Sequence, residues 1–522
     1  MIRPLVAAAL AVIALQLAPA PGSIAGSVVK SGTAIRQPLR NARLELSGGP
    51  NTLIARTDGN GEFMFSNLPP GQYTMAVTCD GYIRQQRSTK IILSARQMAA
   101  KVGFELDPAP TAAGWVLDNV GEPIANVMVE ALRRAYDVRG NARLSRAATG
   151  ITNDRGEYRI FWLDPGDYFF YAASPLPAGD DPAPESAVAP TYFPGVGTPE
   201  GAKPVRLDIG REVRVDFRLQ HAALWSVAGH TMNEVSGRAV PAALTMAPPS
   251  VDPSLSRYQA QSSAAGQFAI EGVAPGSYIL VAKSGAGNQE LTAVERIEIR
   301  AAPAGGAYTT TVSLSPAQVI NGRLFLESGA SADLRQIAVS LTSVDPALPS
   351  PPSVLARTDG QITLNGIVPG NYVVDVSNLP QDFYLKAARF GDADVLENTV
   401  SVGKRPTGDP LQILLGSDGG HLPVKTFDSK GELRTGVNVV LIPDASRRNR
   451  REQYRAGLSG DDGQVTLRGI PPGNYKAFGW EELAPNAYLN PIYLEPYEAL
   501  GVPVKIEAGG NPDLSIRLIP KE

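Results

Sequence analysis

The sequence predicts an all-β protein: a tandem array of about five seven-stranded antiparallel β-sandwich modules. The main observation is a hairpin motif that occurs five times. Each copy has a turn glycine followed twelve residues later by a tyrosine, and the pairs are Gly61/Tyr73, Gly156/Tyr168, Gly266/Tyr278, Gly360/Tyr372 and Gly463/Tyr475. The second observation is that the 52 glycines and 44 prolines fall mostly at turns between runs of alternating apolar residues, which is typical of a turn-rich β protein.

The first copy shows why the motif predicts a hairpin. A tight turn ends at Gly61, where glycine tolerates a positive φ, and Phe63 and Phe65 then alternate with polar residues as in a strand with one buried face. A Pro-Gly pair ending at Gly71 predicts a type II turn with a second positive φ, and another alternating strand begins at Tyr73. The same positive φ is predicted for the equivalent glycines Gly166, Gly276, Gly370 and Gly473.

The residues between copies supply the other strands that such a hairpin needs, because a two-stranded hairpin is not stable alone. In the second module they include residues 114–118, 124–131 and the closing run 213–219, in which apolar residues alternate. About seven short strands per module at this spacing predict a sandwich of two antiparallel sheets.

The spacing of the tyrosines sets the predicted boundaries. We expect a signal peptide at residues 1–22 and modules at 23–107, 108–220, 221–315, 316–417 and 418–522. The single cysteine, Cys79, excludes a disulfide within one chain, so each module must depend on its own apolar core.

The first 22 residues have the composition of an export signal. Arg3 precedes an apolar run from Leu5 to Leu17, and Ala18-Pro19-Ala20 offers small residues for cleavage. The run is too short for a membrane span of about 20 residues, although an uncleaved anchor is the alternative. We therefore expect an exported protein, periplasmic, cell-surface or secreted, without a transmembrane anchor after cleavage.

Within a module, short sequence motifs follow one another in the order that a known domain family has. It runs G-x-V, D-x-x-G-x-P-I-x-N-A-x-V, T-D-x-x-G-x-F and L-x-P-G-x-Y, most fully in modules one and two and least in three and four. This pattern resembles the carboxypeptidase regulatory-like domain, a transthyretin-like β-sandwich grouped with carbohydrate-binding-like folds. The resemblance implies a sandwich fold and a non-catalytic, exported accessory role.

No zinc-peptidase or serine-nucleophile signature is present, so we expect neither an enzyme nor a cofactor; a carboxylate pair of the glycosidase type is the catalytic alternative that the sequence leaves open. The three histidines His221, His230 and His421 lack the His-x-x-Glu pattern of a zinc peptidase, and no G-x-S-x-G nucleophile motif occurs. The acidic turn at Asp58 could hold calcium, but the equivalent turn of module three has no carboxylate and the same length. With 48 basic and 51 acidic residues and no long basic block, nucleic acid is not an expected partner.

Two long insertions contain the candidate ligand contacts. Module two has a proline-rich segment, 174–204, that includes Tyr192 and Phe193, and module five has an aromatic segment with Trp480, Glu481, Glu482, Tyr488, Tyr493 and Tyr497. Aromatic rings beside carboxylates could stack on sugars, which predicts a binding array for polysaccharide or other cell-envelope components. In the alternative, the loops cover sheet edges or pack between modules, and the protein is a structural spacer or a scaffold for another envelope protein.

Overall fold

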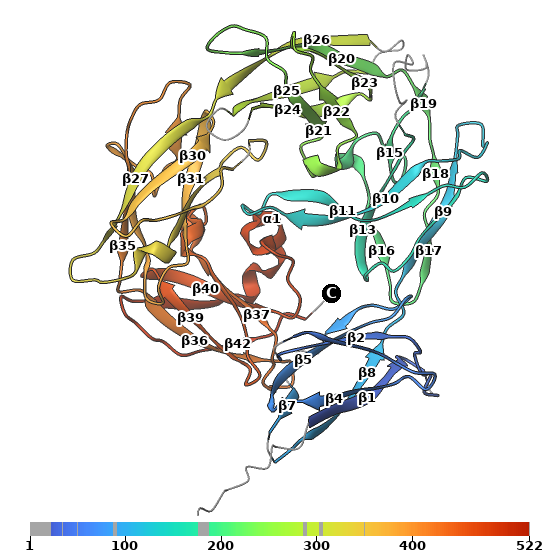
Figure 1. Cartoon of the computed structure of the whole chain (residues 1–522), viewed down its shortest axis with the longest axis vertical. Helices are drawn as coiled ribbons and strands as arrows, with labels where there is room; N and C mark the ends of the chain where they lie inside the picture. The colour runs from blue at the N-terminus through green and yellow to red at the C-terminus, as the bar shows by residue number, and fades with distance from the viewer. Residues whose placement is uncertain are drawn as a thin grey trace, which may run out of the picture. The chain divides into compact units, whose positions relative to one another are not determined.

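The computed structural model describes residues 22–33, 35–49, 51–86, 91–94, 96–175, 187–285, 290–301, 306–348 and 350–520 (Figure 1). The predicted signal segment therefore lies almost entirely outside the described residues, and it stays a prediction. Tertiary contacts divide the chain into two compact units, residues 1–110 and 111–522, which are described separately. Among the described residues, no helix has the length and apolar character needed to cross a membrane.

The protein is all-β, as predicted, and the first unit is one sandwich. Its two sheets have the orders β4-β1-β8 and β3-β2-β5-β6, with β7 also pairing with β5. The bounds are β1 (Gly22–Lys30), β2 (Arg43–Ser47), β3 (Leu53–Arg56), β4 (Glu62–Leu68), β5 (Gly71–Thr78), β6 (Gln85–Gln86), β7 (Ile91–Leu93) and β8 (Ala99–Leu106). Residues of both inner faces form a single apolar core, which includes Ile24, Leu44, Phe63 and Phe104.

The second unit begins with module two, whose sheets are β12-β9-β17 with β18, and β11-β10-β13-β15 with β16; β14 and β19 form a separate pair. The strands are β9 (Thr111–Leu117), β10 (Met128–Tyr136), β11 (Ala142–Ile151), β12 (Glu157–Ile160), β13 (Gly166–Ala173), β14 (Ala187–Val188), β15 (Thr191–Tyr192), β16 (Val205–Leu207), β17 (Glu212–Arg214) and β18 (Phe217–Arg218). The strand β19 (His221–Ala222) lies at the predicted start of module three. All nine residues of β10 pair with β11, and this β10–β11 hairpin contributes to the site described below.

In module three all seven strands join in one path, β22-β21-β24-β25-β26-β20-β23, because β25 pairs with strands of both layers. They are β20 (Trp225–Asn233), β21 (Ala243–Ala247), β22 (Tyr258–Gln261), β23 (Gln267–Val273), β24 (Gly276–Ser284), β25 (Leu291–Ile299) and β26 (Gly306–Pro316).

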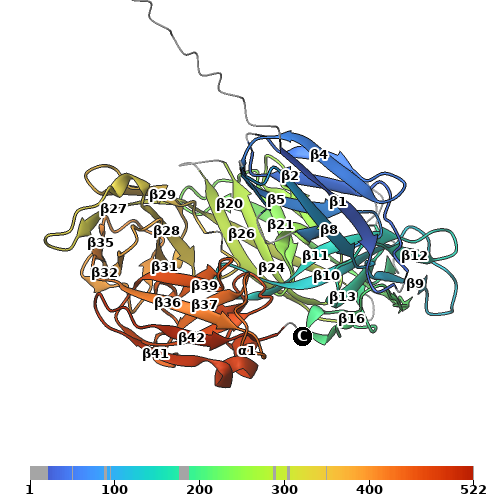
Figure 2. The same cartoon turned by 90° about the horizontal axis from the view of Figure 1, so that it is seen from below.

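Modules four and five return to two sheets each, and the layers of module four can be followed in Figure 2. Module four pairs β30-β27-β35-β32-β33 and β29-β28-β31-β34, and module five pairs β39-β36-β42 and β38-β37-β40-β41. The bounds are β27 (Gln318–Leu326), β28 (Ala338–Ser343), β29 (Val354–Leu355), β30 (Gln361–Ile367), β31 (Gly370–Ser377), β32 (Tyr384–Phe390), β33 (Ala393–Asp394), β34 (Val400–Val402), β35 (Leu411–Gly416), β36 (Gly420–Phe427), β37 (Asn438–Pro443), β38 (Arg455–Leu458), β39 (Gln464–Ile470), β40 (Gly473–Trp480), β41 (Val502–Ile506) and β42 (Leu514–Arg517). A short helix, α1 (Pro491–Leu494), lies in the module-five insertion.

The pairing of the closing strand in each sandwich differs from the expected antiparallel order. The closing strand runs parallel to the opening strand, as in β1–β8, β9–β17, β20–β26, β27–β35 and β36–β42. The chain crosses between the two sheets before it closes, so the last strand enters beside the first in the same direction. Alternating apolar residues show which face of a strand is buried but not its direction.

The turn glycines have the predicted backbone, with φ values of 74°, 70°, 76°, 82° and 67° at Gly61, Gly156, Gly266, Gly360 and Gly463. In every module the glycine carbonyl accepts a hydrogen bond from an amide near the end of the opening strand, as in Val28 N to Gly61 O at 2.8 Å. The turn is thereby fixed to the opening strand, and the spacing of the motif follows from that contact.

A positive φ was predicted for the glycine of each Pro-Gly pair. This is wrong at Gly71, Gly370 and Gly473, which do not have a positive φ. Gly166 and Gly276 do have a positive φ, of 138° and 155°. Each of these five glycines is the first residue of a strand and pairs in a ladder, and none of them has the φ of about +80° that a type II turn requires. The left-handed residue lies six positions before the tyrosine in all five modules: Asn67, Trp162, Gly272, Gly366 and Gly469. In four modules it coincides with a shift of strand register. A bulge therefore bends the chain there.

Candidate functional site

The aromatic segment of module five covers one face of a sheet. In β37, Val439 and Leu441 point into the sandwich core, while the alternate residues Val440 and Ile442 pack on the other face with Trp480. Trp480 is only 2% exposed and stacks on Phe478, with ring centroids 5.2 Å apart and an interplanar angle of 13°. The sheet is thus buried on both faces, and Trp480 cannot offer its ring to a ligand in this arrangement.

The other residues of the expected platform do not form a coplanar surface. Tyr497 meets Trp480 edge-on at 5.8 Å, Tyr488 lies against Tyr454 at 6.1 Å, and Tyr493 packs against Tyr136 of module two at 5.8 Å. Glu481 and Glu482 are exposed at the start of the segment. The expectation that these rings stack together on sugars is therefore corrected, because they cover the face of the sheet that lies outside the sandwich core.

Of the candidates in the module-two insertion, Tyr192 is buried and Phe193 is half-buried. Tyr192 is in β15, which pairs with β13, and its ring lies 4.6 Å from that of Tyr171. Phe193 packs on the module core, 6.3 Å from Phe217. This segment extends the sheet and covers it, so neither ring is presented to a ligand.

The structure brings a different set of residues together at the tip of the β10–β11 hairpin, residues 137–141. The amide Nδ2 of Asn490 donates to the Gly140 carbonyl at 2.8 Å, which joins the tip to module five. Arg139 Nη1 donates to the Ser343 carbonyl at 3.1 Å, which joins it to module four. Figure 1 shows the hairpin extending toward α1. One hairpin of module two therefore contacts two modules that are distant in sequence.

The same hairpin also binds module three along its length. Leu144 N donates to the Ser250 carbonyl at 2.8 Å, and the amide of Asp252 donates back to Leu144 at 3.0 Å, as in a short parallel bridge. Leu132 and Leu144 share an apolar cluster with Val251. Backbone hydrogen bonds and a buried apolar cluster therefore both hold the hairpin against module three.

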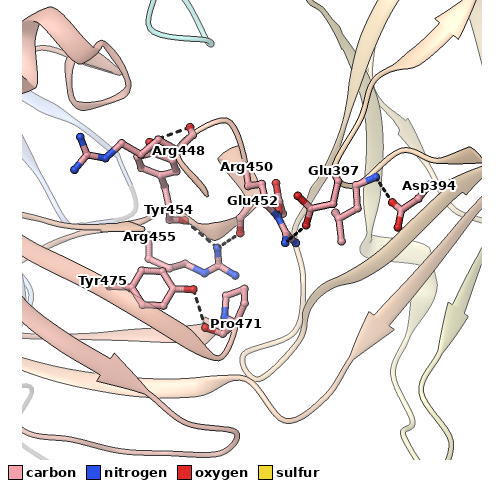
Figure 3. A network of polar contacts seen from close by, with 10 residues as sticks. Asp394, Glu397, Arg448, Arg450, Glu452, Tyr454, Arg455, Pro471 and Tyr475 are labelled. Carbon is pink, nitrogen blue, oxygen red and sulfur yellow. Dashed lines mark hydrogen bonds and ion pairs between the residues drawn. The ribbon is translucent and has the colours of Figure 1, made fainter. Parts of the chain in front are cut away.

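Charged side chains join modules four and five (Figure 3). The guanidinium of Arg450 bridges Glu452 and Glu397, each at 2.7 Å, and Arg451 lies 3.6 Å from Asp375. Burial raises the pKa of the Glu452 carboxyl, an effect that Arg450 opposes. The nearby Arg455 donates to main-chain carbonyls, including Tyr454 O at 2.8 Å, and burial lowers its pKa. These contacts fix the arginine-rich loop 447–451 in place.

Sequence reasoning missed the hairpin tip and assigned no role to the arginine-rich loop. A signal was available, since Asp137 and Gly140 form another acidic turn: the Asp137 carboxylate accepts hydrogen bonds from the amides of Arg139 and Asn141. The acidic turn at Asp58 is built in the same way, because its Oδ1 accepts from the amides of Asn60 and Glu62 at 2.8 and 2.9 Å. The carboxylates of Asp58 and Asp137 therefore stabilise their turns by accepting main-chain hydrogen bonds.

The described residues include no candidate metal site, and their free thiol, Cys79, is not activated. No group of three or more His, Cys, Asp or Glu side chains there could hold a metal ion. Cys79 is a free thiol whose pKa is raised, first by burial and then by the charge of Asp80, so the reactive thiolate is disfavoured.

Comparison with known proteins identifies one module. Residues 23–106 match the family model of the carboxypeptidase regulatory-like domain. The match covers module one alone, so the similarity is assigned to that module and not to the whole chain. No curated protein matches the chain.

Several solved structures are similar to this chain at low identity. They include the TIE protein of Bacillus anthracis (10% identity, 76% of this chain and 69% of that chain, TM-score 0.16) and the minor pilin GBS52 of Streptococcus agalactiae (12%, 38% and 96%, TM-score 0.23). Two B repeat units of the collagen-binding protein of Staphylococcus aureus also match (11%, 76% and 100%, TM-score 0.15). The fold assignment itself rests on the strand pairing described above.

Proposed function

We propose that this is an exported, non-catalytic protein in which modules two to five form a rigid interaction scaffold of the cell envelope. The observation that supports it is the β10–β11 hairpin, which contacts modules three, four and five. A flexible string of modules needs no such contact, whereas a scaffold that presents surfaces in a fixed geometry does.

Gly140 provides the test, because it is where the hairpin meets module five. Its φ is +80°, and a Cβ built on it would lie 2.7 Å from the Leu489 carbonyl carbon. Gly121, in another turn of module two, has φ +95° with nothing within 4 Å of a Cβ, so Gly121→Ala reproduces the backbone strain without the clash.

Gly140→Ala is expected to release the hairpin tip, so that hydrogen exchange and proteolytic cleavage at residues 137–141 increase. Gly121→Ala should leave these rates at the tip unchanged. Equal protection of the tip in both variants and the wild type would refute the rigid scaffold, and so would rapid cleavage of the tip in the wild type.

A second candidate, contact with carbohydrate, is favoured by Trp162. This residue has φ +58° and is 61% exposed, at the bulge position where modules three to five have glycine. A left-handed non-glycine residue costs roughly 1–2 kcal/mol, and an exposed indole recovers little of that by burial. Because such strain is often found at functional sites, we propose that Trp162 and the neighbouring exposed Phe161 stack on sugar rings. Retention on insoluble polysaccharide should then be lost in Trp162→Gly and kept in Asn67→Gly; equal retention by the two variants would exclude this role.

A further inference from the structure

A cavity of about 180 Å³ lies where the β10–β11 hairpin tip meets modules four and five. Its wall includes the guanidinium-bearing residues Arg139, Arg448 and Arg451, together with Asn449 and a single carboxylate residue, Asp375. The remaining wall is largely apolar, with Val373, Val374 and Leu489. Three positive groups and one negative group therefore face a small, partly desolvated space.

The partners of these arginines do not balance the charge. Arg448 Nη2 binds Glu498 at 2.7 Å, but the same carboxylate also accepts from Lys476 at 3.0 Å. Arg139 donates to a neutral carbonyl, that of Ser343, and Arg451 is 3.6 Å from Asp375. Burial lowers the pKa of Arg139; the nearby Asp137 opposes this, and the charge of Arg451 adds to it. Bringing like charges together in a half-buried place is unfavourable unless an anion neutralises them.

We infer that this cavity binds a compact oxyanion, a phosphate group or the carboxylate of an acidic sugar, between module two and modules four and five. The planar guanidinium fork matches both groups and can donate two parallel hydrogen bonds to either. A water molecule needs roughly 10–15 Å³ of such space, so a volume of about 180 Å³ leaves room for one such group together with some water.

The inference rests on the proposed scaffold, since the cavity exists only while the hairpin tip is docked. The bound anion would touch residues of distant modules and would therefore stabilise the docked arrangement. A ligand that binds only the native state raises its stability with concentration.

The experiment uses the mature chain and measures calorimetric binding and melting temperature with inorganic phosphate and with glucuronate. Chloride at equal ionic strength is the reference. We expect saturable binding of at least one of the two anions. Tighter binding of phosphate would indicate a phosphate ligand, and tighter binding of glucuronate would indicate the carboxylate of an acidic sugar. No saturable binding of either would overturn the inference.

Variants then locate the site. Arg139→Gln and Arg451→Gln should each weaken binding by about tenfold or more, because each removes a charged hydrogen-bond donor. Arg155→Gln removes one charge from an exposed turn of the same module and should leave binding unchanged. Asp375→Asn removes the only carboxylate of the wall and should strengthen binding, a result that loss of structure cannot produce. Equal binding by all four variants would also overturn the inference.

Cleavage at the hairpin tip, measured on the same samples, separates the two proposals. A protected tip without anion binding rejects the anion site alone, whereas a freely cleaved tip in the wild type rejects the scaffold together with it.

Discussion

The phenolic hydroxyl of Tyr372 donates a hydrogen bond of 2.7 Å to the main-chain carbonyl oxygen of Val368, four residues earlier. Both residues are buried. The same contact occurs in every module, from Tyr73 to Pro69, Tyr168 to Asp164, Tyr278 to Ala274 and Tyr475 to Pro471. The tyrosine of the motif therefore satisfies a carbonyl at the bend between two strands, which explains why the residue is not phenylalanine.

Removing this hydroxyl should destabilise module four. In Tyr372→Phe the Val368 carbonyl stays buried without its partner, which costs about 1–3 kcal/mol. Tyr372→Ala also removes the ring and should cost more, in the range of 3–5 kcal/mol for an aromatic truncation. Denaturant unfolding of the two variants separates the hydroxyl from the ring, and a Phe variant as stable as the wild type would contradict the role given to the bond.

The corner tyrosines also predict weaker folding at high pH. Burial raises the pKa of Tyr372 and of Tyr475 to about 12, from an ordinary value of 10.0. The folded state therefore disfavours the phenolate, so this contribution is complete below pH 10 and is lost as the pH rises toward 12. The free energy of unfolding measured from pH 9 to 12 should fall, and the fall should be smaller in Tyr372→Phe than in the wild type.

A turn glycine should be far less replaceable than another left-handed glycine of the same module. Gly360 has φ +82°, and a Cβ there would lie 2.5 Å from the Leu324 carbonyl oxygen; Gly329 has φ +86° with nothing within 4 Å. Gly329→Ala should cost about 1 kcal/mol from backbone strain. Gly360→Ala adds a clash with backbone and should cost at least 1 kcal/mol more in denaturant unfolding, since overpacking typically costs 1–3 kcal/mol. Equal losses of stability in the two variants would show that the positive φ alone, and not the contact with Leu324, requires glycine at position 360.

The Pro-Gly glycines show where sequence reasoning failed and why. A proline followed by glycine was sufficient to predict a bend near Gly370, and a bend is there. The positive φ, however, lies four residues earlier, at Gly366, because the strand contains a bulge. A bulge depends on the register with the opposite strand, which a local pattern does not contain.

The hairpin motif predicted the repeated sandwiches because alternation, turn glycine and tyrosine are local features. The site could not be predicted in that way. Gly140 meets Asn490 across 350 positions in sequence, and no composition or spacing links them. The sequence showed that aromatic residues are concentrated in module five but not what they contact. They cover the outer face of a sheet, lined by Val440 and Phe478, which lies outside the sandwich core.

Trp480 should therefore contribute to stability. Trp480→Ala leaves a cavity between the sheet and its cover, and we expect a loss of roughly 3–5 kcal/mol. Ile492→Ala is the matched control, since Ile492 belongs to α1 in the same segment and is 77% exposed. Thermal melting should distinguish the two variants clearly. If Trp480→Ala melted like the wild type and lost retention on polysaccharide, the Trp480 ring would bind the ligand. The aromatic segment that covers it would then have to move away to expose the ring.

The bulge position of module two gives the last prediction, and it separates stability from function. Trp162→Gly should raise the free energy of unfolding by about 1 kcal/mol, because glycine adopts φ +58° without the steric cost of a side chain and little indole burial is lost. Asn67→Gly at the equivalent bulge should change stability by only a few tenths of a kcal/mol, since asparagine already tolerates the left-handed region. Denaturant unfolding of both variants decides the matter: a destabilised Trp162→Gly would mean that the indole packs against the protein, and the strained backbone would then be explained without a ligand.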